Sequence, residues 1–596
     1  MQRVASGLVR LIEATGIILF IAFISGCGGT YNVLPTLTEK TKLEAEEGVV
    51  VARVINASSY PLPFNNIVID PENLNESKKV KSSELKARTP YETGTTVFAS
   101  VVKAGSYALS NINAYHFHGD YRYYRYIFSD AKFGTFQVKP GQVTDLGTLI
   151  FYPKPQTDKY IETILRLPEP ELGEVMRKYF PFFEYNPENI LSWEDDGKDD
   201  ERESFYVSVA QNPVSYSDKY QAPDGSMYFL GKLGIILKRS ADGEWDIDGV
   251  DTNLQLNTIA QNQKGDLVVG GQEGKLFWKP AGGDWQDASM AYDFTIHKVF
   301  FSKENTIDMV ASQNSKLFVF RSLASPTALA WEALNQYDSV KNWKLFGLGD
   351  QAVEKSTKKK SKNKKISAPK LKRVTAVSVD ENEHLIRVGL SSMGSRGAFP
   401  DPSFLTFGYD PQSWRTFKPE ELPEMDYSFD SGKARLGLKK PGFWSWSGRN
   451  SYYRFDDNSK NWEEIRTSVS RCSDGTFTQK NSCRENGKKV KPRRDSFSFN
   501  SFPVFKSNLE AITIATFSNF DFWSGKRDKE IKILRTLDGG KNWQDTGYNL
   551  PNKYCASLIS EVTDRLLLSC RGATSEFYES LDDGATWQQV RDHENF

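Results

Sequence analysis

The sequence predicts a mainly β protein in which a small antiparallel β-sandwich is followed by a seven-bladed β-propeller. Short runs of alternating apolar and polar residues recur over residues 48–153, as half-buried strands require. Over residues 204–596 a polar turn followed by a tryptophan recurs at intervals of 40 to 48 residues. Two longer intervals, of 83 and 81 residues, each contain a polar insertion, near 354–373 and 470–494. A repeat of this length is typical of propeller blades.

Seven tryptophans mark the repeat, which predicts one blade for each. They are Trp245, Trp285, Trp331, Trp414, Trp462, Trp543 and Trp587. The second unit shows the pattern best. Three apolar runs, over 256–260, 266–271 and 274–278, precede the turn into Trp285, and the strand expected at that tryptophan is the fourth. If either long interval contains a unit without a tryptophan, the count is eight blades instead.

The region before the repeat divides into two parts. Residues 48–153 contain at least six short β-like runs separated by turns, which favours a sandwich and loosely resembles transthyretin-like modules. His116 and His118 could present two metal ligands in line with Asp120, or could belong to an aromatic-rich strand that packs a sheet face. We favour the strand and expect no metal. Residues 154–203 take a helical spacing and then become acidic, so they are interpreted as a helical connector and a linker.

The first residues resemble a bacterial lipoprotein signal peptide. Residues 1–26 carry a basic start and a short apolar run, and the sequence Ile24-Ser-Gly-Cys27 resembles a lipobox. The resemblance implies cleavage before Cys27, acylation of that cysteine, and a flexible tether over 27–47. In a Gram-negative source, Gly28 would favour the outer membrane over inner-membrane retention. An ordinary signal peptide whose apolar region ends at a cysteine is the alternative.

The remaining four cysteines agree with export to an oxidising compartment. Cys555 and Cys570 flank two β-like runs around a turn, so a hairpin would place them opposite each other. Cys472 and Cys483 are expected to close the polar insertion between them. Four free buried thiols are the alternative. A metal site is not expected, because no Cys-x-x-Cys or neighbouring His pair occurs.

A Ser/Thr-x-Asp-x-Gly-x-x-Trp pattern occurs twice, 44 residues apart. Its members are Thr536, Asp538, Gly540 and Trp543, and then Ser580, Asp582, Gly584 and Trp587. The aspartate can accept backbone N–H bonds across a turn, the glycine supplies a positive φ, and the tryptophan packs back as an apolar plug. The pattern resembles the Asp-box of sialidase-like (BNR) propellers. The resemblance implies a structural role for these residues, because Asp-box turns belong to the scaffold.

Composition and the motifs that are absent argue against several classes of function. Lys+Arg and Asp+Glu are both 76, and this balance argues against a nucleic-acid-binding protein. The sequence has no P-loop, dinucleotide fingerprint or nucleophile elbow. Sialidases open their catalytic domain with Phe/Tyr-Arg-Ile-Pro, which is absent, so no catalytic residue is carried over. The Lys-rich segment 355–373 is either a solvated insertion, which we favour, or a contact for anionic lipid or an acidic partner.

These observations predict a lipid-anchored envelope protein that is not an enzyme and that has no cofactor or metal site. Its expected role is a binding or assembly platform for an envelope protein or a glycan. The alternative is a glycan-active, sialidase-like hydrolase that uses the central opening of the propeller.

Overall fold

The computed structural model describes residues 32–591 except for several internal segments. These are 58–63, 73–80, 89–94, 119–120, 128–132, 157–158, 169, 205–215, 292–293, 303–305, 323–330, 339–371, 382, 393–402, 418–426, 440–449, 521–526, 553–554, 561–564 and 571–575. The signal segment 1–26, Cys27, Asp120 and most of the Lys-rich insertion therefore lie outside the described residues. Within the described part, no helix is long and apolar enough to cross a bilayer.

The N-terminal domain contains two sheets and a short helix. The first sheet holds, in spatial order, β1 (Asn32–Leu34), β4 (Ser83–Lys86), β3 (Phe64–Pro71), β6 (Gly105–His118) and β7 (Tyr121–Ile127), with β8 (Thr135–Val138) paired to β6. The second holds β10 (Lys159–Leu167), β9 (Val143–Gln156), β2 (Glu47–Asn56) and β5 (Thr95–Lys103), with β11 (Ile190–Leu191) paired to β9. Helix α2 (Leu172–Tyr179) and the turn η1 (Pro187–Asn189) follow β10.

The alternation of strand β2 explains how these layers pack. Val50 and Val54 belong to a core that residues of both sheets share. Val49 and Val51 point to the opposite face, where they pack with Val175 of α2. Because successive side chains of a strand point to opposite faces, one apolar strand serves both contacts. The domain is thus layered as sheet, sheet and helix, and β2 is fully covered.

Two predictions about this region are wrong. The tether was expected to reach residue 47, but β1 pairs in parallel with β4, and Leu37 is buried. The connector was expected to be helical from its start, but β10 pairs with β9 along its whole length, and the helical residues come later, in α2 and at 199–204. The run over 159–167 fits both periodicities because it is short, and the long-range partner β9 decides between them.

The rest of the chain is built of four-stranded antiparallel units. The described part of residues 216–591 forms seven successive sheets, named sheets 1 to 7, and one separate two-stranded hairpin of β34 (Cys483–Glu485) and β35 (Lys488–Val490). Sheet 1 is β12 (Tyr216–Gln221), β13 (Met227–Gly231), β14 (Ile235–Arg239) and β15 (Trp245–Gly249). Sheet 2 is β16 (Leu256–Gln261), β17 (Leu267–Gly271), β18 (Leu276–Lys279) and β19 (Gln286–Asp287), with the turn η2 (Gln272–Gly274) before β18. Sheet 3 is β20 (Thr295–Phe301), β21 (Ile307–Gln313), β22 (Lys316–Ser322) and β23 (Trp331–Asp338).

The later sheets follow the same order, with one enlarged member. Sheet 4 is β24 (Lys372–Asp380), β25 (Leu385–Ser392), β26 (Ser403–Tyr409) and β27 (Thr416–Phe417). Sheet 5 is β28 (Tyr427–Ser431), β29 (Ala434–Lys439), β30 (Ser451–Asp456) and β31 (Asn461–Ile465). Sheet 6 is β33 (Phe477–Thr478), β32 (Ser468–Arg471), β36 (Arg493–Phe499), β38 (Ala511–Phe520), β39 (Arg527–Thr536) and β40 (Gln544–Asp545), with β37 (Val504–Phe505) on β38. Sheet 7 is β41 (Cys555–Ser560), β42 (Leu566–Cys570), β43 (Phe577–Ser580) and β44 (Gln588–Arg591).

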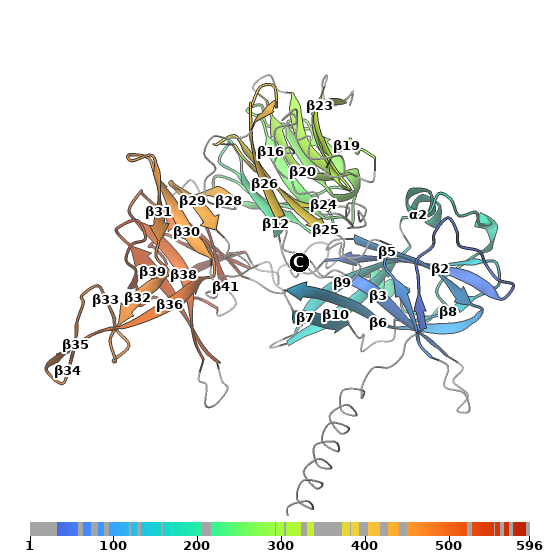
Figure 1. Ribbon diagram of the computed structural model, residues 1–596, viewed down its shortest axis with the longest axis horizontal. Helices are drawn as coiled ribbons and strands as arrows, with labels where there is room; N and C mark the ends of the chain where they lie inside the picture. Colours follow the sequence, from blue (N-terminus) through green and yellow to red (C-terminus); the bar gives the residue numbers. More distant parts are fainter. Residues whose placement is uncertain are drawn as a thin grey trace, which may run out of the picture.

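Each sheet packs on the next, and the last packs on the first. Apolar clusters join sheets 1 and 2, 2 and 3, 3 and 4, 5 and 6, and 6 and 7. Sheets 4 and 5 are linked by Arg435 of β29 and Asp380 of β24, 3.4 Å apart. Phe577 of sheet 7 packs on Phe229 of sheet 1, with ring centroids 5.3 Å apart. Antiparallel sheets that follow one another and close on the first are a β-propeller. Figure 1 shows sheets 2 to 4 in green and yellow, between sheets 5 and 6 in orange and the blue N-terminal strands.

The seven tryptophans occupy one structural position. Each lies within two residues of the start of the outermost strand of a different sheet, from Trp245 at the first residue of β15 to Trp587 directly before β44. A second repeated feature is a register shift near the start of the innermost strand of five sheets. The residues passed over are Ser217, Asn257, His297, Thr375 and Ala556. A bulge of this kind turns a side chain out of the regular alternation.

Candidate functional site

The first Ser/Thr-x-Asp-x-Gly-x-x-Trp turn is held by its own side chains. Thr536 Oγ1 donates to Asp538 Oδ1 over 2.9 Å and accepts from the Gly540 N–H over 2.9 Å. Asp538 accepts two further bonds from Asn542, from its backbone N–H (2.8 Å) and its Nδ2 (2.7 Å). Burial alone would raise the pKa of Asp538, but the bonds from Asn542 and Thr536 outweigh it and lower that pKa. The buried Trp543 packs edge-on against Phe499 below the turn.

The second turn repeats this network. Ser580 Oγ donates to Asp582 Oδ1 over 2.9 Å and accepts from the Gly584 N–H over 2.7 Å. Thr586 donates to Asp582 through its backbone N–H (2.8 Å) and hydroxyl (2.6 Å), and these bonds lower the pKa of Asp582. Trp587 packs against the apolar cluster between sheets 6 and 7. In both turns the carboxylate is used by the turn itself, so neither aspartate is directed at a ligand.

Buried arginines join neighbouring sheets. Arg239 of β14 is 1% exposed, and its Nη2 lies 2.7 Å from Glu579 Oε2 of β43. Its guanidinium also stacks over Trp245, 5.2 Å from the ring centroid. Burial would raise the pKa of Glu579, but the Arg239 guanidinium lowers it overall. This pair connects sheet 1 to sheet 7 and so closes the ring.

The other joints use the same chemistry with different partners. Asp308 of β21 accepts two bonds of 2.7 Å from Arg321 of the same sheet. Its Oδ2 also accepts the indole N–H of Trp414 in sheet 4 over 2.6 Å. Asp380 likewise faces Arg435 of the next sheet, 3.4 Å away. Among the described residues, these acids are thus paired with basic or indole groups of their own or the next sheet.

A carboxylate cluster joins the ring to the N-terminal domain. Glu273 lies in η2, between two strands of sheet 2, and its side chain is 11% exposed. Its Oε1 is 3.1 Å from Arg53 Nη2 of β2, and its Oε2 is 3.4 Å from Lys178 Nζ of α2. Arg53 is 7% exposed. Desolvation would raise the pKa of Glu273, but Arg53 and Lys178 lower it overall, so the carboxylate is ionised at neutral pH. We name Glu273, Arg53 and Lys178 the docking cluster.

The backbone at the docking cluster is strained. Glu273 has φ 52°, in the left-handed region that few residues other than glycine adopt. Such a conformation costs about 1 kcal/mol or more and is retained where the surroundings compensate it. On the neighbouring loop, Lys232 donates to Gln255, whose carbonyl accepts the N–H of Gln272 next to Glu273 over 3.0 Å. Burial lowers the pKa of Lys232 to about 8.

One pair outside these joints has the form of a nucleophile and its base. His297 Nε2 lies 2.7 Å from Ser312 Oγ, and His297 occupies the bulge of β20. Burial lowers the pKa of His297 to about 4, so the imidazole is neutral at pH 7 and a weak base. Ser312 is 5% exposed, which keeps its hydroxyl from a substrate. The pair serves to satisfy two buried polar groups.

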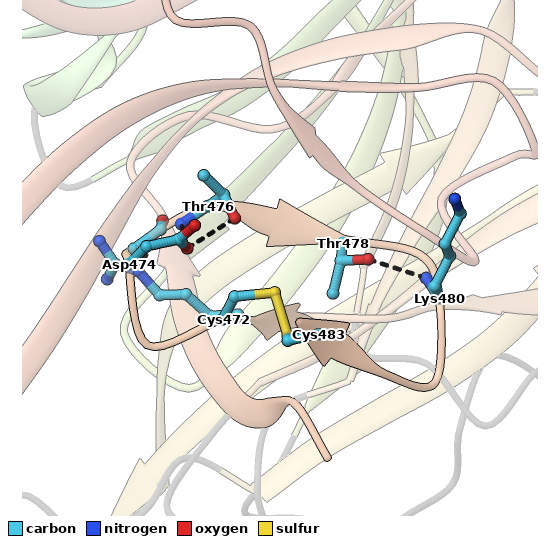
Figure 2. The surroundings of a disulfide bond; sticks show 8 residues. Cys472, Asp474, Thr476, Thr478, Lys480 and Cys483 are labelled. Atoms are coloured by element: carbon cyan, nitrogen blue, oxygen red, sulfur yellow. Dashed lines mark hydrogen bonds between the residues drawn. A yellow bond between two sulfur atoms is a disulfide. The ribbon is translucent and has the colours of Figure 1, made fainter. Parts of the chain in front are cut away.

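Both disulfide bonds join cysteines that are close in sequence. Cys555 and Cys570 are directly opposite in the β41–β42 pairing. Cys472 and Cys483 close the insertion of sheet 6, as Figure 2 shows. Among the described residues, Glu576 together with Cys555 and Cys570 is the group closest to a metal-site arrangement, but disulfide sulfurs are not thiolate ligands. Disulfide bonds indicate an extracytoplasmic compartment.

Several residues predicted from the sequence are not at a described site, and the sequence did not predict the residues of the docking cluster. Cys27 lies outside the described residues, and His116 and His118 are in β6 with side chains that are not described. The docking cluster was missed because Arg53 and Glu273 are 220 residues apart. The local sequence shows only an arginine within an apolar strand, and this pattern does not indicate which carboxylate pairs with it.

Comparisons with known proteins find distant structural matches. No protein-family model and no curated protein matches the chain. A structure of YCF48 bound to D1 peptide is 10% identical, with a TM-score of 0.31, over 61% of this chain and 90% of that one. The WD40 propeller domain of Doa1 is 9% identical, with a TM-score of 0.28, over 63% and 96%. BamB from Moraxella catarrhalis is 10% identical, with a TM-score of 0.26, over 61% and 79%. The propeller assignment rests on the strand topology of this chain.

Proposed function

We propose that the protein is a lipid-anchored envelope platform that is not an enzyme and that presents a propeller to a protein or glycan partner. In this proposal the N-terminal domain is a β-sandwich, sheets 1 to 7 are seven blades, and the two aspartate turns are Asp-boxes. Cys27 carries the acyl chains, and the outer membrane is the expected location.

The docking cluster carries the proposal. A buried carboxylate held by cations from two elements of another domain fixes the orientation of the ring on that domain, because a shifted arrangement of the two packed domains would leave the buried Glu273 and Arg53 without each other. A platform needs such a fixed orientation. Since β1 begins at Asn32, residues 27–31 are the tether between the acylated cysteine and the N-terminal domain in this proposal. Five residues span at most about 17 Å when extended, so the anchor would hold the N-terminal domain close to the bilayer.

The ring itself supports a binding role over hydrolysis. A sialidase-like site would need several arginines converging on one carboxylate. The buried Arg239 and the mostly buried Arg435 instead pair with acids of neighbouring sheets. We therefore do not propose the hydrolase as a second function.

Two measurements test the proposal. The wild-type chain expressed in a bacterial envelope should incorporate a labelled fatty acid, and Cys27→Ser should abolish incorporation while leaving the disulfide bonds intact. Chemical cross-linking in native envelopes should give one stoichiometric partner, which is lost with Glu273→Gln and kept with the surface variant Glu174→Gln. Labelling that persists in Cys27→Ser would overturn the anchor. Release of sugar from envelope glycans by the purified chain would overturn the non-enzymatic role.

A further inference from the structure

The insertion of sheet 6 forms a stapled projection, which we name the basic finger (residues 472–494). It leaves β32, returns through β36, and is closed by the Cys472–Cys483 disulfide. At its tip β34 and β35 form a two-stranded hairpin, whose turn residues Asn486 and Gly487 have φ 47° and 77°. Positive φ at both positions is what a two-residue hairpin turn requires. Figure 1 shows β34 and β35 at the edge of the molecule, beyond β33.

The finger carries a strong excess of positive charge. Seven of its residues are basic and exposed: Lys480, Arg484, Lys488, Lys489, Lys491, Arg493 and Arg494. Its two acids are Asp474 and Glu485. Asp474 accepts the Thr476 N–H (2.9 Å) and hydroxyl (2.7 Å) in its own turn (Figure 2). The whole chain has a formal net charge of zero, so this excess is local.

The register of the hairpin concentrates the charge on one face. Glu485 is directly opposite Lys488, an arrangement of opposite charges. On the other face Arg484 is directly opposite Lys489. Like charges directly opposite each other in an antiparallel pair destabilise it. An anion placed against this face would reduce that repulsion. The disulfide ties Cys483, the first residue of the hairpin, to Cys472 at the base of the finger, so the base of the hairpin is fixed before the anion arrives.

The composition of the finger favours one kind of anion. The strongly exposed large hydrophobic residues of the described chain, such as Leu509, Leu537 and Leu581, all lie outside residues 472–494. Protein interfaces concentrate aromatic residues at their centre and are poor in lysine, and single-stranded nucleic-acid sites use exposed aromatic rings. The finger offers four lysines and a half-buried Phe477. Clusters of lysine and arginine without apolar anchors bind the phosphate headgroups of anionic lipids.

We propose that the basic finger binds a membrane surface of anionic, phosphate-bearing lipids. The contact is electrostatic, made by the Arg484–Lys489 face and the cations that follow it. It is a second membrane contact that needs no acylation of Cys27, and it is therefore independent of the proposed anchor.

The test compares full-length chains that all carry Cys27→Ser, so that acyl chains do not contribute. Sedimentation with vesicles of phosphatidylcholine and phosphatidylglycerol is compared with sedimentation with phosphatidylcholine alone. Each basic residue near an anionic surface contributes about fivefold, so Arg484→Gln with Lys489→Gln should weaken binding about 25-fold. Lys264→Gln with Lys460→Gln removes two exposed turn lysines elsewhere and should leave binding unchanged.

The unsubstituted finger supplies a second readout. Its binding should fall steeply as ionic strength rises, because exposed charges are screened. Inorganic phosphate at matched ionic strength should compete only weakly, since a surface presents many headgroups at once. Equal binding to both vesicle types, or equal binding by the two double variants, would overturn the proposal. Tighter binding of a single-stranded oligonucleotide or polyglutamate than of the anionic vesicles would also overturn it.

Discussion

The docking cluster makes the strongest prediction, through Glu273→Gln. The substitution keeps the shape of the side chain and removes its charge, which leaves Arg53 and Lys178 beside a neutral amide. Arg53 is 7% exposed and Lys178 is 20% exposed, so neither cation is well hydrated in place. Breaking a buried pair in this way costs about 3 kcal/mol. At about 1.4 kcal/mol per factor of ten, the equilibrium between docked and separated domains shifts about 150-fold.

A matched control lies on the same lysine. Glu174 contacts Lys178 over 3.2 Å, but it is 47% exposed, so Glu174→Gln should cost less than about 0.5 kcal/mol. Hydrogen exchange measures the effect as faster exchange in α2 and η2, with the remaining strands unchanged. Replacing Arg53 by Met and Glu273 by Leu together should restore part of the protection, because the buried guanidinium is removed with the carboxylate and Lys178 keeps its contact with Glu174. If Glu273→Gln exchanges like Glu174→Gln, the cluster does not hold the domains together.

The same cluster has a pH dependence whose sign follows from the pKa of Glu273. That pKa is lowered in the folded state, so the stabilisation is complete above the unfolded value, about 4.3. It is lost as the pH falls through the lower folded value. We therefore expect the two domains to remain docked at neutral pH and to separate only in acid.

Three other predictions concern the ring. Asp538→Ala should lower the free energy of unfolding of sheet 6 by about 1–2 kcal/mol, measured by urea unfolding. Lys541→Ala on the same turn should change that free energy little, and equal effects of the two substitutions would refute the role of the carboxylate. Replacing Cys555 and Cys570 by Ser should cost about 3 kcal/mol, and a reductant should then have no further effect on sheet 7. Burial lowers the pKa of His297 to about 4 in the folded state, so the unfolded state binds the proton first and stability falls as the pH drops from 6.5 to about 4. His297→Asn should make this fall smaller. An unchanged dependence of stability on pH would contradict the burial of that imidazole.

Local patterns were sufficient for the repeat, but not for contacts between distant segments. The tryptophans could be located because each follows a polar turn, and the same position recurs in sheet after sheet. Cys555 and Cys570 could be paired because a hairpin brings them together over 15 residues. The strand β10 could not be distinguished from a helix, because its partner decides its conformation. Arg166 shows the same dependence, since it stacks on Trp193 and binds Asp199 far along the chain.

The joint between the first and last sheets bears on how the chain is made. During synthesis sheet 1 emerges early, and the face that carries Phe229 and Leu237 cannot make its contacts with sheet 7 until that sheet has left the ribosome. Until then the growing chain exposes an apolar strand face that could pair wrongly with another chain. Arg239 likewise cannot form its ion pair with Glu579 until the chain has been extended by 340 residues. Export in an unfolded state, followed by ring closure in the new compartment, would keep this face from being exposed in a half-built ring.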